Sequence, residues 1–298
     1  MNLKHRLLVV PALLTVSALT LSGCGGGAGA DSTQGDAPVG PISQRAAALG
    51  DQFDQASMSI VSAKLEDAVA ACMKEQGFDY TPRTWDTSGL TQSTGVPAWD
   101  SLEFAKTYGY GITTWEDIPG VSKASDAPPS GDDAESTQPG YQDALWGPGY
   151  DPTAGGQPGG CYGKALDETA GKALVDSTVP RDVANLQQQV DEDDRVVAAL
   201  ARWSDCMGGK GYDYKTPTEA QTSIANRAYS SPDGLAGAQL TALRNEEIST
   251  AVADYGCSTD LRKIRATVLA GLETDYYAKH KTEVDDYFDQ VDKYLNGD

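Results

Sequence analysis

The chain has 298 residues, 43 of them acidic and 23 basic, so its formal net charge is −20. This charge excludes a nucleic-acid-binding surface as the default and argues against electrostatic attraction to anionic lipid, because both need clustered Lys and Arg. The length allows one or two domains, and the 32 Gly and 15 Pro beside 40% hydrophobic residues indicate a modest core with much loop.

The first 23 residues have the pattern of a signal peptide. A short basic start precedes an apolar stretch, from about residue 7 to 19, that is too short and too interrupted to span a membrane. The segment ends in Leu-Ser-Gly-Cys, which resembles the bacterial lipoprotein signal. That resemblance implies cleavage after Gly23 and attachment of lipid, palmitate included, to Cys24; an ordinary secretory signal with a chance cysteine is the alternative. Two or more acyl chains anchor stably, and the Gly-rich residues 24–41 predict a flexible tether.

Helical spacing of apolar residues recurs from residue 42 onward, and no strand-like alternation of useful length occurs. In chain order, the sequence predicts helices over residues 42–76 with a break near Gly50, 101–107, 141–146, 163–178 and 182–207, then between Pro217 and Pro232, and over 237–255 and 259–296. We expect Val179-Pro180 to end the fourth of these helices and Asp182 to cap the fifth. Residues 120–140 are rich in Ser, Pro, Gly and acidic residues, which predicts disorder.

The last predicted helix, residues 259–296, is the longest. Steps of three and four persist throughout it, so we expect one continuous helix of roughly 55 Å, capped by Ser258 or Thr259. His280 lies on its apolar stripe, and we interpret it as a half-buried structural histidine. The opposite face is acidic and predicts exposure to solvent: Glu273, Asp275, Glu283, Asp285, Asp286, Asp289 and Asp292. A second acidic run, residues 191–194, also indicates a solvated helix face, because consecutive helical carboxylates diverge and form only part of a calcium shell.

The cysteines reveal an internal repeat. The pattern C-M-x-x-x-G-aromatic-D-Y begins at Cys72 and again at Cys206, while Cys161 and Cys257 each follow a glycine. Four cysteines allow three pairings. The repeat favours Cys72–Cys161 and Cys206–Cys257, one disulfide in each half, over the two pairings that would join the halves. Each bridge closes a long loop and contributes roughly 4 kcal/mol on the chain-entropy model.

The repeated motif predicts the end of a helix. Apolar residues at helical spacing precede each Cys-Met pair, and Gly77 or Gly211 follows at the position of a left-handed cap. Phe78 and Tyr212 are then expected to turn back onto the helix end. We therefore interpret the motif as an element that specifies the fold rather than an active site.

Together these patterns predict a mainly α fold. Two related helical units, each stapled by a disulfide and carrying long Gly/Pro-rich loops, would span residues 42–180 and 181–298. We expect the units to pack together, because each alone has little apolar surface to bury.

The aromatic residues of the first unit form the one candidate binding site. Flat aromatic faces on loops, beside carboxylates and hydroxyls, suit sugar rings or peptides. The candidate ligand-binding residues are Trp99, Tyr108, Tyr110, Trp115 and Trp146. The alternative is that these side chains form a minor core that covers the helices.

No pattern in the sequence predicts catalysis or a bound cofactor. A nucleophile elbow, a zinc-protease helix, an EF-hand loop and a phosphate-binding loop are all missing. A metal site is disfavoured, since there is no C-x-x-C spacing and His280 is the one histidine after the signal peptide. We therefore expect a protein that is not an enzyme, although a hydrolase that uses two of the many carboxylates stays an open alternative.

The lipoprotein signal, the two C-M motifs, the Tyr-Gly-Tyr-Gly-Ile turn at residues 108–112 and the segment from Ala144 to Cys161 together resemble a group of uncharacterised secreted lipoproteins of actinobacteria. The resemblance spans most of residues 60–260. It implies an extracytoplasmic domain on the outer face of the cell membrane, and the group brings no established activity. The sequence thus predicts a lipid-anchored envelope protein that binds cell-wall glycan, peptide or protein; an accessory subunit of a membrane complex, such as an exporter, is the alternative.

Overall fold

The computed structural model describes residues 37–50, 55–82, 96–119, 138–151, 157–230 and 235–296. All regular elements in these ranges are helical, which confirms the predicted mainly α fold. The signal peptide, the tether up to residue 36 and residues 120–137 of the predicted disordered segment lie outside the described residues.

The first-half elements follow the predicted order closely. They are α1 (Pro41–Gly50), α2 (Gln55–Glu75), α3 (Leu102–Tyr108), the 3₁₀ turn η2 (Trp115–Asp117), α5 (Tyr141–Trp146), α6 (Gly160–Leu166), the π-helical turn η5 (Asp167–Gly171) and α7 (Lys172–Val175). The helices predicted over 101–107 and 141–146 are confirmed, and α1 ends at Gly50, where the sequence predicts a break; residues 51–54 lie outside the described residues. The helix predicted over 163–178 has the wrong bounds, because the helical segment begins at Gly160 and ends at Val175. Its middle turn, η5, has the wider π-helical geometry.

The second half contains α8 (Val179–Glu192), α9 (Asp194–Gly209), α10 (Pro217–Tyr229), α11 (Gly237–Cys257), α12 (Thr259–Lys279) and α13 (Lys281–Asn296). Val179-Pro180 does not end a helix as predicted but opens α8, where proline fits because first-turn N–H groups have no helical partner. The single helix predicted over 182–207 is also wrong. Asp193 has extended backbone and caps α9, its carboxylate accepting from the N–H of Arg195. Residues 191–194 are therefore a helix boundary.

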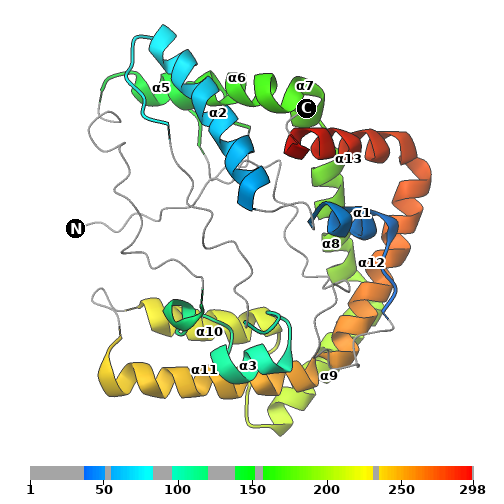
Figure 1. The fold of residues 1–298 in the computed structure, drawn as a ribbon. Helices are drawn as coiled ribbons and strands as arrows, with labels where there is room; N and C mark the ends of the chain where they lie inside the picture. The colour runs from blue at the N-terminus through cyan, green and yellow to red at the C-terminus, as the bar shows by residue number, and fades with distance from the viewer. Residues whose placement is uncertain are drawn as a thin grey trace.

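The predicted continuous C-terminal helix is broken at His280. The backbone there leaves helical geometry, with φ −122° and ψ 29°, so α13 turns away from α12 (Figure 1). The His280 ring stacks on Tyr276 with centroids 4.5 Å apart, and its Nδ1 lies 2.8 Å from the Glu283 carboxylate. His280 is half-buried, as predicted. Ser258 precedes α12 but does not cap it with its side chain.

Both C-M motifs end their helices in the same way. In the first, the N–H of Gly77 donates to the carbonyl of Lys74 and the N–H of Phe78 donates to the carbonyl of Met73. In the second, Gly211 and Tyr212 make the equivalent bonds to Gly208 and Met207. Gly77 and Gly211 have φ of +84° and +90°. This pair of bonds is the Schellman motif, and it confirms the predicted glycine caps.

The two disulfides are Cys72–Cys161 and Cys206–Cys257, so the within-half pairing is confirmed. The shared Gly-Cys context is not a structural repeat, because Cys161 lies in the first turn of α6 whereas Cys257 ends α11. The bridges also differ in exposure. Cys72 and Cys161 are 7% and 2% exposed, whereas Cys206 lies on the surface of α9.

Both halves contribute to one buried core. Its apolar residues come from helices that include α2, α5 and α6 of the first half and α8, α9, α12 and α13 of the second. Figure 1 shows α2, α5 and α6 at the top with α13, α8 and α12 along one side, and α10 and α11 at the bottom with α3. In addition, α1 packs on α12 and α3 packs on α11, so helices of the first predicted unit contact helices of the second.

One of these contacts corrects the predicted acidic face. Glu273 of α12 is 1% exposed, and its carboxylate accepts from the backbone N–H of Ile42 at 3.1 Å and of Ser43 at 2.9 Å. A distant side chain thus satisfies the first N–H groups of α1, which have no partner within that helix. Gly40 is required here, because a Cβ at this position would overlap the Glu273 carboxylate. No helix in the described ranges is both long and apolar enough to cross a bilayer.

Candidate functional site

The Tyr-Gly-Tyr-Gly turn follows directly from α3. Ser101 caps this helix, accepting from the N–H of Phe104 at 3.0 Å. The chain then reverses at Gly109, with φ +65°, and passes over α11. A Cβ at Gly109 would lie 2.7 Å from Cγ of Glu247. Glycine therefore allows both the left-handed backbone and the close approach to α11.

Glu247 of α11 holds this loop. Its side chain is fully buried, and its carboxylate accepts from the backbone N–H groups of Tyr110 at 3.1 Å, Ile112 at 2.7 Å and Thr113 at 2.9 Å. The Thr113 hydroxyl donates a fourth hydrogen bond. One charged acceptor thus fixes the backbone of residues 110–113, and hydrogen bonds to charged groups are stronger than those between neutral groups.

Two further α11 side chains hold the same loop. Arg244 donates to the carbonyl of Thr113 at 3.1 Å and pairs with Asp117 of η2 at 2.8 Å. Tyr110 donates its hydroxyl hydrogen bond to Asp254 at 3.1 Å. Burial, and then the adjacent Asp254 carboxylate, raise the pKa of the Tyr110 phenol. The phenol is therefore a neutral donor.

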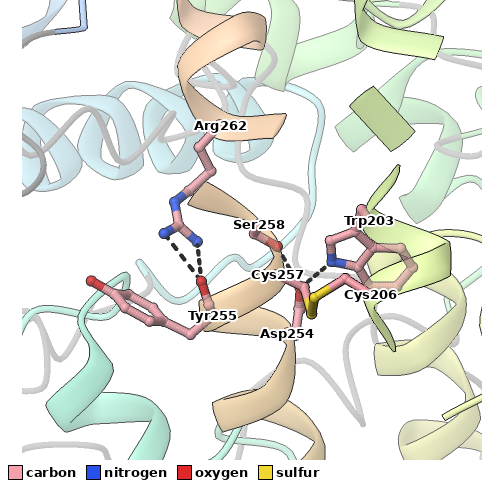
Figure 2. The surroundings of a disulfide bond; sticks show 7 residues. All are labelled: Trp203, Cys206, Asp254, Tyr255, Cys257, Ser258 and Arg262. Carbon is pink, nitrogen blue, oxygen red and sulfur yellow. Dashed lines mark hydrogen bonds between the residues drawn. A yellow bond between two sulfur atoms is a disulfide. The ribbon is translucent and has the colours of Figure 1, made fainter. Parts of the chain in front are cut away.

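Asp254 also joins the loop to the second disulfide. Its carboxylate accepts from Trp203 Nε1 at 2.8 Å and from the Ser258 hydroxyl at 2.5 Å (Figure 2). Trp203 lies on α9, three residues before Cys206, and Ser258 directly follows Cys257 at the end of α11, so both adjoin the disulfide. In the same view, Arg262 donates twice to the carbonyl of Tyr255. The α9–α11 junction is therefore a rigid support for the loop.

Two tryptophans beside this loop are exposed to solvent: Trp99 precedes α3, and Trp115 follows the loop in η2. Trp99 and Trp115 are 49% and 48% exposed, with ring centroids 6.0 Å apart and ring planes inclined by 42°. Beneath them, Trp99 packs on the buried Phe104 at 4.6 Å. We call Trp99 and Trp115 the tryptophan surface. Tyr229 of α10 is 72% exposed, and its hydroxyl lies 3.4 Å from the carbonyl of Ile112, a contact at the limit of hydrogen bonding.

The structure separates the five predicted ligand-binding residues. Trp99 and Trp115 lie together at the surface, whereas Tyr108 and Tyr110 support the loop from within. Trp146 ends α5, where it packs against Tyr150 and Tyr162 beside the first disulfide. Figure 1 places α5 and α3 at opposite ends of the molecule, so Trp146 is not part of the tryptophan surface. For Tyr110 and Trp146, the minor-core interpretation describes the structure better.

Sequence reasoning missed Glu247, Arg244 and Asp254. On a helix of this acidic chain, each resembles an ordinary solvated residue. The one available signal was the Gly-Tyr-Gly turn, whose glycines indicate close approach of backbone to another group. The packing of α3 on α11 determines which side chain fills that space, and no local sequence pattern predicts this tertiary contact.

The chain was compared with protein-family models, with curated proteins and with solved structures, and none of the three comparisons finds a match. Within the described ranges, no group of three or more His, Cys, Asp or Glu side chains is arranged to hold a metal ion. The buried carboxylates Glu247 and Glu273 are already engaged by backbone N–H groups and hydroxyls of the chain itself.

Proposed function

We propose that this protein is a lipid-anchored, non-enzymatic binding module of the cell envelope and that the tryptophan surface holds its ligand. The observation that supports this most is a pair of half-exposed tryptophans that meet beside a loop fixed by Glu247. Trp99 precedes α3, and Trp115 follows the loop. Exposed indoles cost free energy in water, and a loop that is already ordered loses little entropy when a ligand binds.

The chemistry around the surface favours a glycan as the ligand. The flat face of an indole packs against the apolar face of a sugar ring, and polar side chains at its edge bond the hydroxyls. Glu116 and the Asp117–Arg244 ion pair lie at or beside η2, next to Trp115. Cell-wall glycan is the ligand of this class that a protein anchored outside the membrane would meet.

The anchor part of the proposal rests on Cys24 and the signal that precedes it. If Cys24 carries lipid, the chain fractionates with membranes after expression in a Gram-positive host, and Cys24→Ser moves it to the medium. A Cys24→Ser protein that stays with the membrane would remove the anchor from the proposal.

Co-sedimentation with purified cell wall tests the ligand. Residues 37–298 are suitable, because they include Val39 and Gly40, whose carbonyls bond α1. We expect this protein to pellet with the wall and the double variant Trp99→Ala/Trp115→Ala to stay in solution. Trp146→Ala, which removes a tryptophan from the other end of the molecule, is the matched control and should pellet normally. Equal pelleting of the double variant would exclude the tryptophan surface as the site.

The exporter-subunit alternative gains no support from α13. This helix buries Val284, Tyr287, Phe288, Val291 and Leu295 in the core of the chain itself. Deleting it would therefore disrupt the fold, and loss of a partner in such a deletion would carry no information about docking.

A further inference from the structure

A groove lies between α9 and α12, and its lining includes neither residue of the tryptophan surface. Its volume is about 520 Å³, within the range of small-molecule sites. Its lining consists of Arg195, Ala198, Arg202, Asp260, Lys263, Ile264, Thr267 and Val268. Ala198 has the smallest side chain in this lining. Ala198 lies between Arg195 and Arg202 on one face of α9, so the two long side chains form the rim over a shallow floor.

Three of the eight residues that line this groove are cationic, although the chain as a whole is strongly acidic. Arg195 and Arg202 are seven residues apart on α9, about 10 Å along the axis. Arg195 is held by two hydrogen bonds to Asp193, at 2.9 and 2.8 Å, and Arg202 pairs with Asp260 at 3.1 Å. Lys263 of α12 is exposed, and within the described part of the chain its ammonium makes no ion pair. Lys263 is therefore the cation available to an anion in the groove.

The floor supplies the apolar half of the site. Ile264 and Val268 are one turn apart on the same face of α12 and adjoin Ala198 across the groove. Thr267 adds a hydroxyl whose hydrogen bond goes to the carbonyl of Lys263 at 2.8 Å. The pattern is an aliphatic floor with cations at its edge.

We infer that the groove between α9 and α12 binds a small amphipathic anion, with a phosphate, carboxylate or sulfonate head on Lys263 and an aliphatic part on Ala198, Ile264 and Val268. The net charge of −20 favours a small ligand over a polyanion. Charges are screened beyond about 8 Å at physiological salt, so a small anion interacts mainly with the groove. A nucleic acid or an anionic membrane would extend over the acidic surroundings and be repelled.

Isothermal titration calorimetry of the full-length chain with hexyl phosphate tests the inference. Hexanol, which lacks the charge, and inorganic phosphate, which lacks the chain, are titrated in parallel. Lys263→Met removes the free cation, and Ala198→Leu fills the groove without a change of charge. Lys279→Met is the matched control, because Lys279 is an exposed lysine about 24 Å along the same helix.

We expect hexyl phosphate to bind about tenfold more weakly to Lys263→Met, and at least tenfold more weakly to Ala198→Leu, while Lys279→Met matches the parent. Hexanol and inorganic phosphate should each bind more weakly than hexyl phosphate. Equal affinity of parent, Lys263→Met and Ala198→Leu would overturn the inference, as would no heat of binding at millimolar hexyl phosphate. Inorganic phosphate binding as tightly as hexyl phosphate would overturn the amphipathic class. None of these results depends on the tryptophan surface.

Discussion

Glu273 accepts a hydrogen bond at 2.9 Å from the backbone N–H of Ser43, a residue 230 positions earlier in the chain. Glu247 plays the same part for Tyr110, Ile112 and Thr113. Two buried carboxylates of the second half therefore fix the start of α1 and the loop after α3. Since each faces backbone donors, its removal leaves buried N–H groups without a partner, which is more costly than the loss of a side-chain pair.

Replacing Glu247 should therefore destabilise the protein strongly. We expect Glu247→Ala to lower the free energy of unfolding by roughly 2–4 kcal/mol and to expose the amides of residues 110–113 to hydrogen exchange. Glu246→Ala is the control, because the neighbouring Glu246 makes an exposed ion pair with Arg227. Such an exposed pair contributes about 1 kcal/mol or less to the free energy of unfolding. Urea unfolding and amide exchange measure both quantities, and equal effects of the two variants would refute the role of Glu247.

The sequence predicted those features that have a local cause. Each C-M motif contains the helix-end glycine and the following aromatic that a Schellman motif needs, so the caps could be read from nine residues. The disulfide pairing followed from the repeat, although Cys161 and Cys257 lie at opposite ends of their helices. The predicted pairing was therefore correct because of one half of the repeat only, the equivalent helix ends that contain Cys72 and Cys206.

Features with a tertiary cause were not predictable. Glu273 follows an acidic helix pattern, and only the packing of α1 on α12 buries it. The break at His280 keeps the N–H of Val284 bonded to the His280 carbonyl, so the apolar spacing passes through it unchanged. Trp99 lies just before α3 and Trp146 ends α5, and no local sequence pattern indicates that α3 packs on α11 whereas α5 packs on α6.

Substitution of the cap glycines should show their conformational role. At Gly77 and Gly211, no atom lies within 4 Å of the position that an alanine Cβ would take, so the cost of alanine there is backbone strain alone. We expect Gly77→Ala and Gly211→Ala each to destabilise by about 1 kcal/mol. Gly271→Ala, in the middle of α12 and equally unobstructed, should instead stabilise by up to about 1 kcal/mol. Thermal unfolding shows whether each substitution stabilises or destabilises the protein. A Gly211→Ala variant more stable than the parent would contradict the role of Gly211 as a left-handed helix cap.

The two disulfides should differ in reactivity towards reductant. Nucleophilic attack on a disulfide, by a thiolate or a phosphine, requires access to a sulfur atom, and Cys206 is exposed whereas Cys72 and Cys161 are buried. Under native conditions we expect a phosphine reductant to open Cys206–Cys257 first. Alkylation followed by peptide mass spectrometry identifies the reduced pair. In denaturant the preference should vanish, and early labelling of Cys72 in the native protein would contradict the difference in burial.

Stability should fall in alkaline solution. Burial raises the pKa of Tyr287 from 10.0 to about 12. The unfolded chain ionises first, so the stabilising contribution is complete below pH 10 and is lost as the pH rises to about 12. We expect Tyr287→Phe to reduce this loss by roughly 2–3 kcal/mol, at 1.36 kcal/mol for each unit of the pKa difference. Tyr229→Phe is the exposed control and should not change the pH profile of unfolding, which circular dichroism can follow. A Tyr287→Phe profile identical to the parent's would contradict this assignment.

The most direct test of a pre-organised tryptophan surface uses a variant that keeps both tryptophans. Cell-wall co-sedimentation of Glu247→Ala is compared with that of Glu246→Ala at a temperature where both retain parental helix content. We expect Glu246→Ala to pellet like the parent and Glu247→Ala to remain mostly in solution, because its loop no longer holds Trp115 in place against Trp99. Full pelleting of Glu247→Ala would contradict the view that α11 builds this surface for binding.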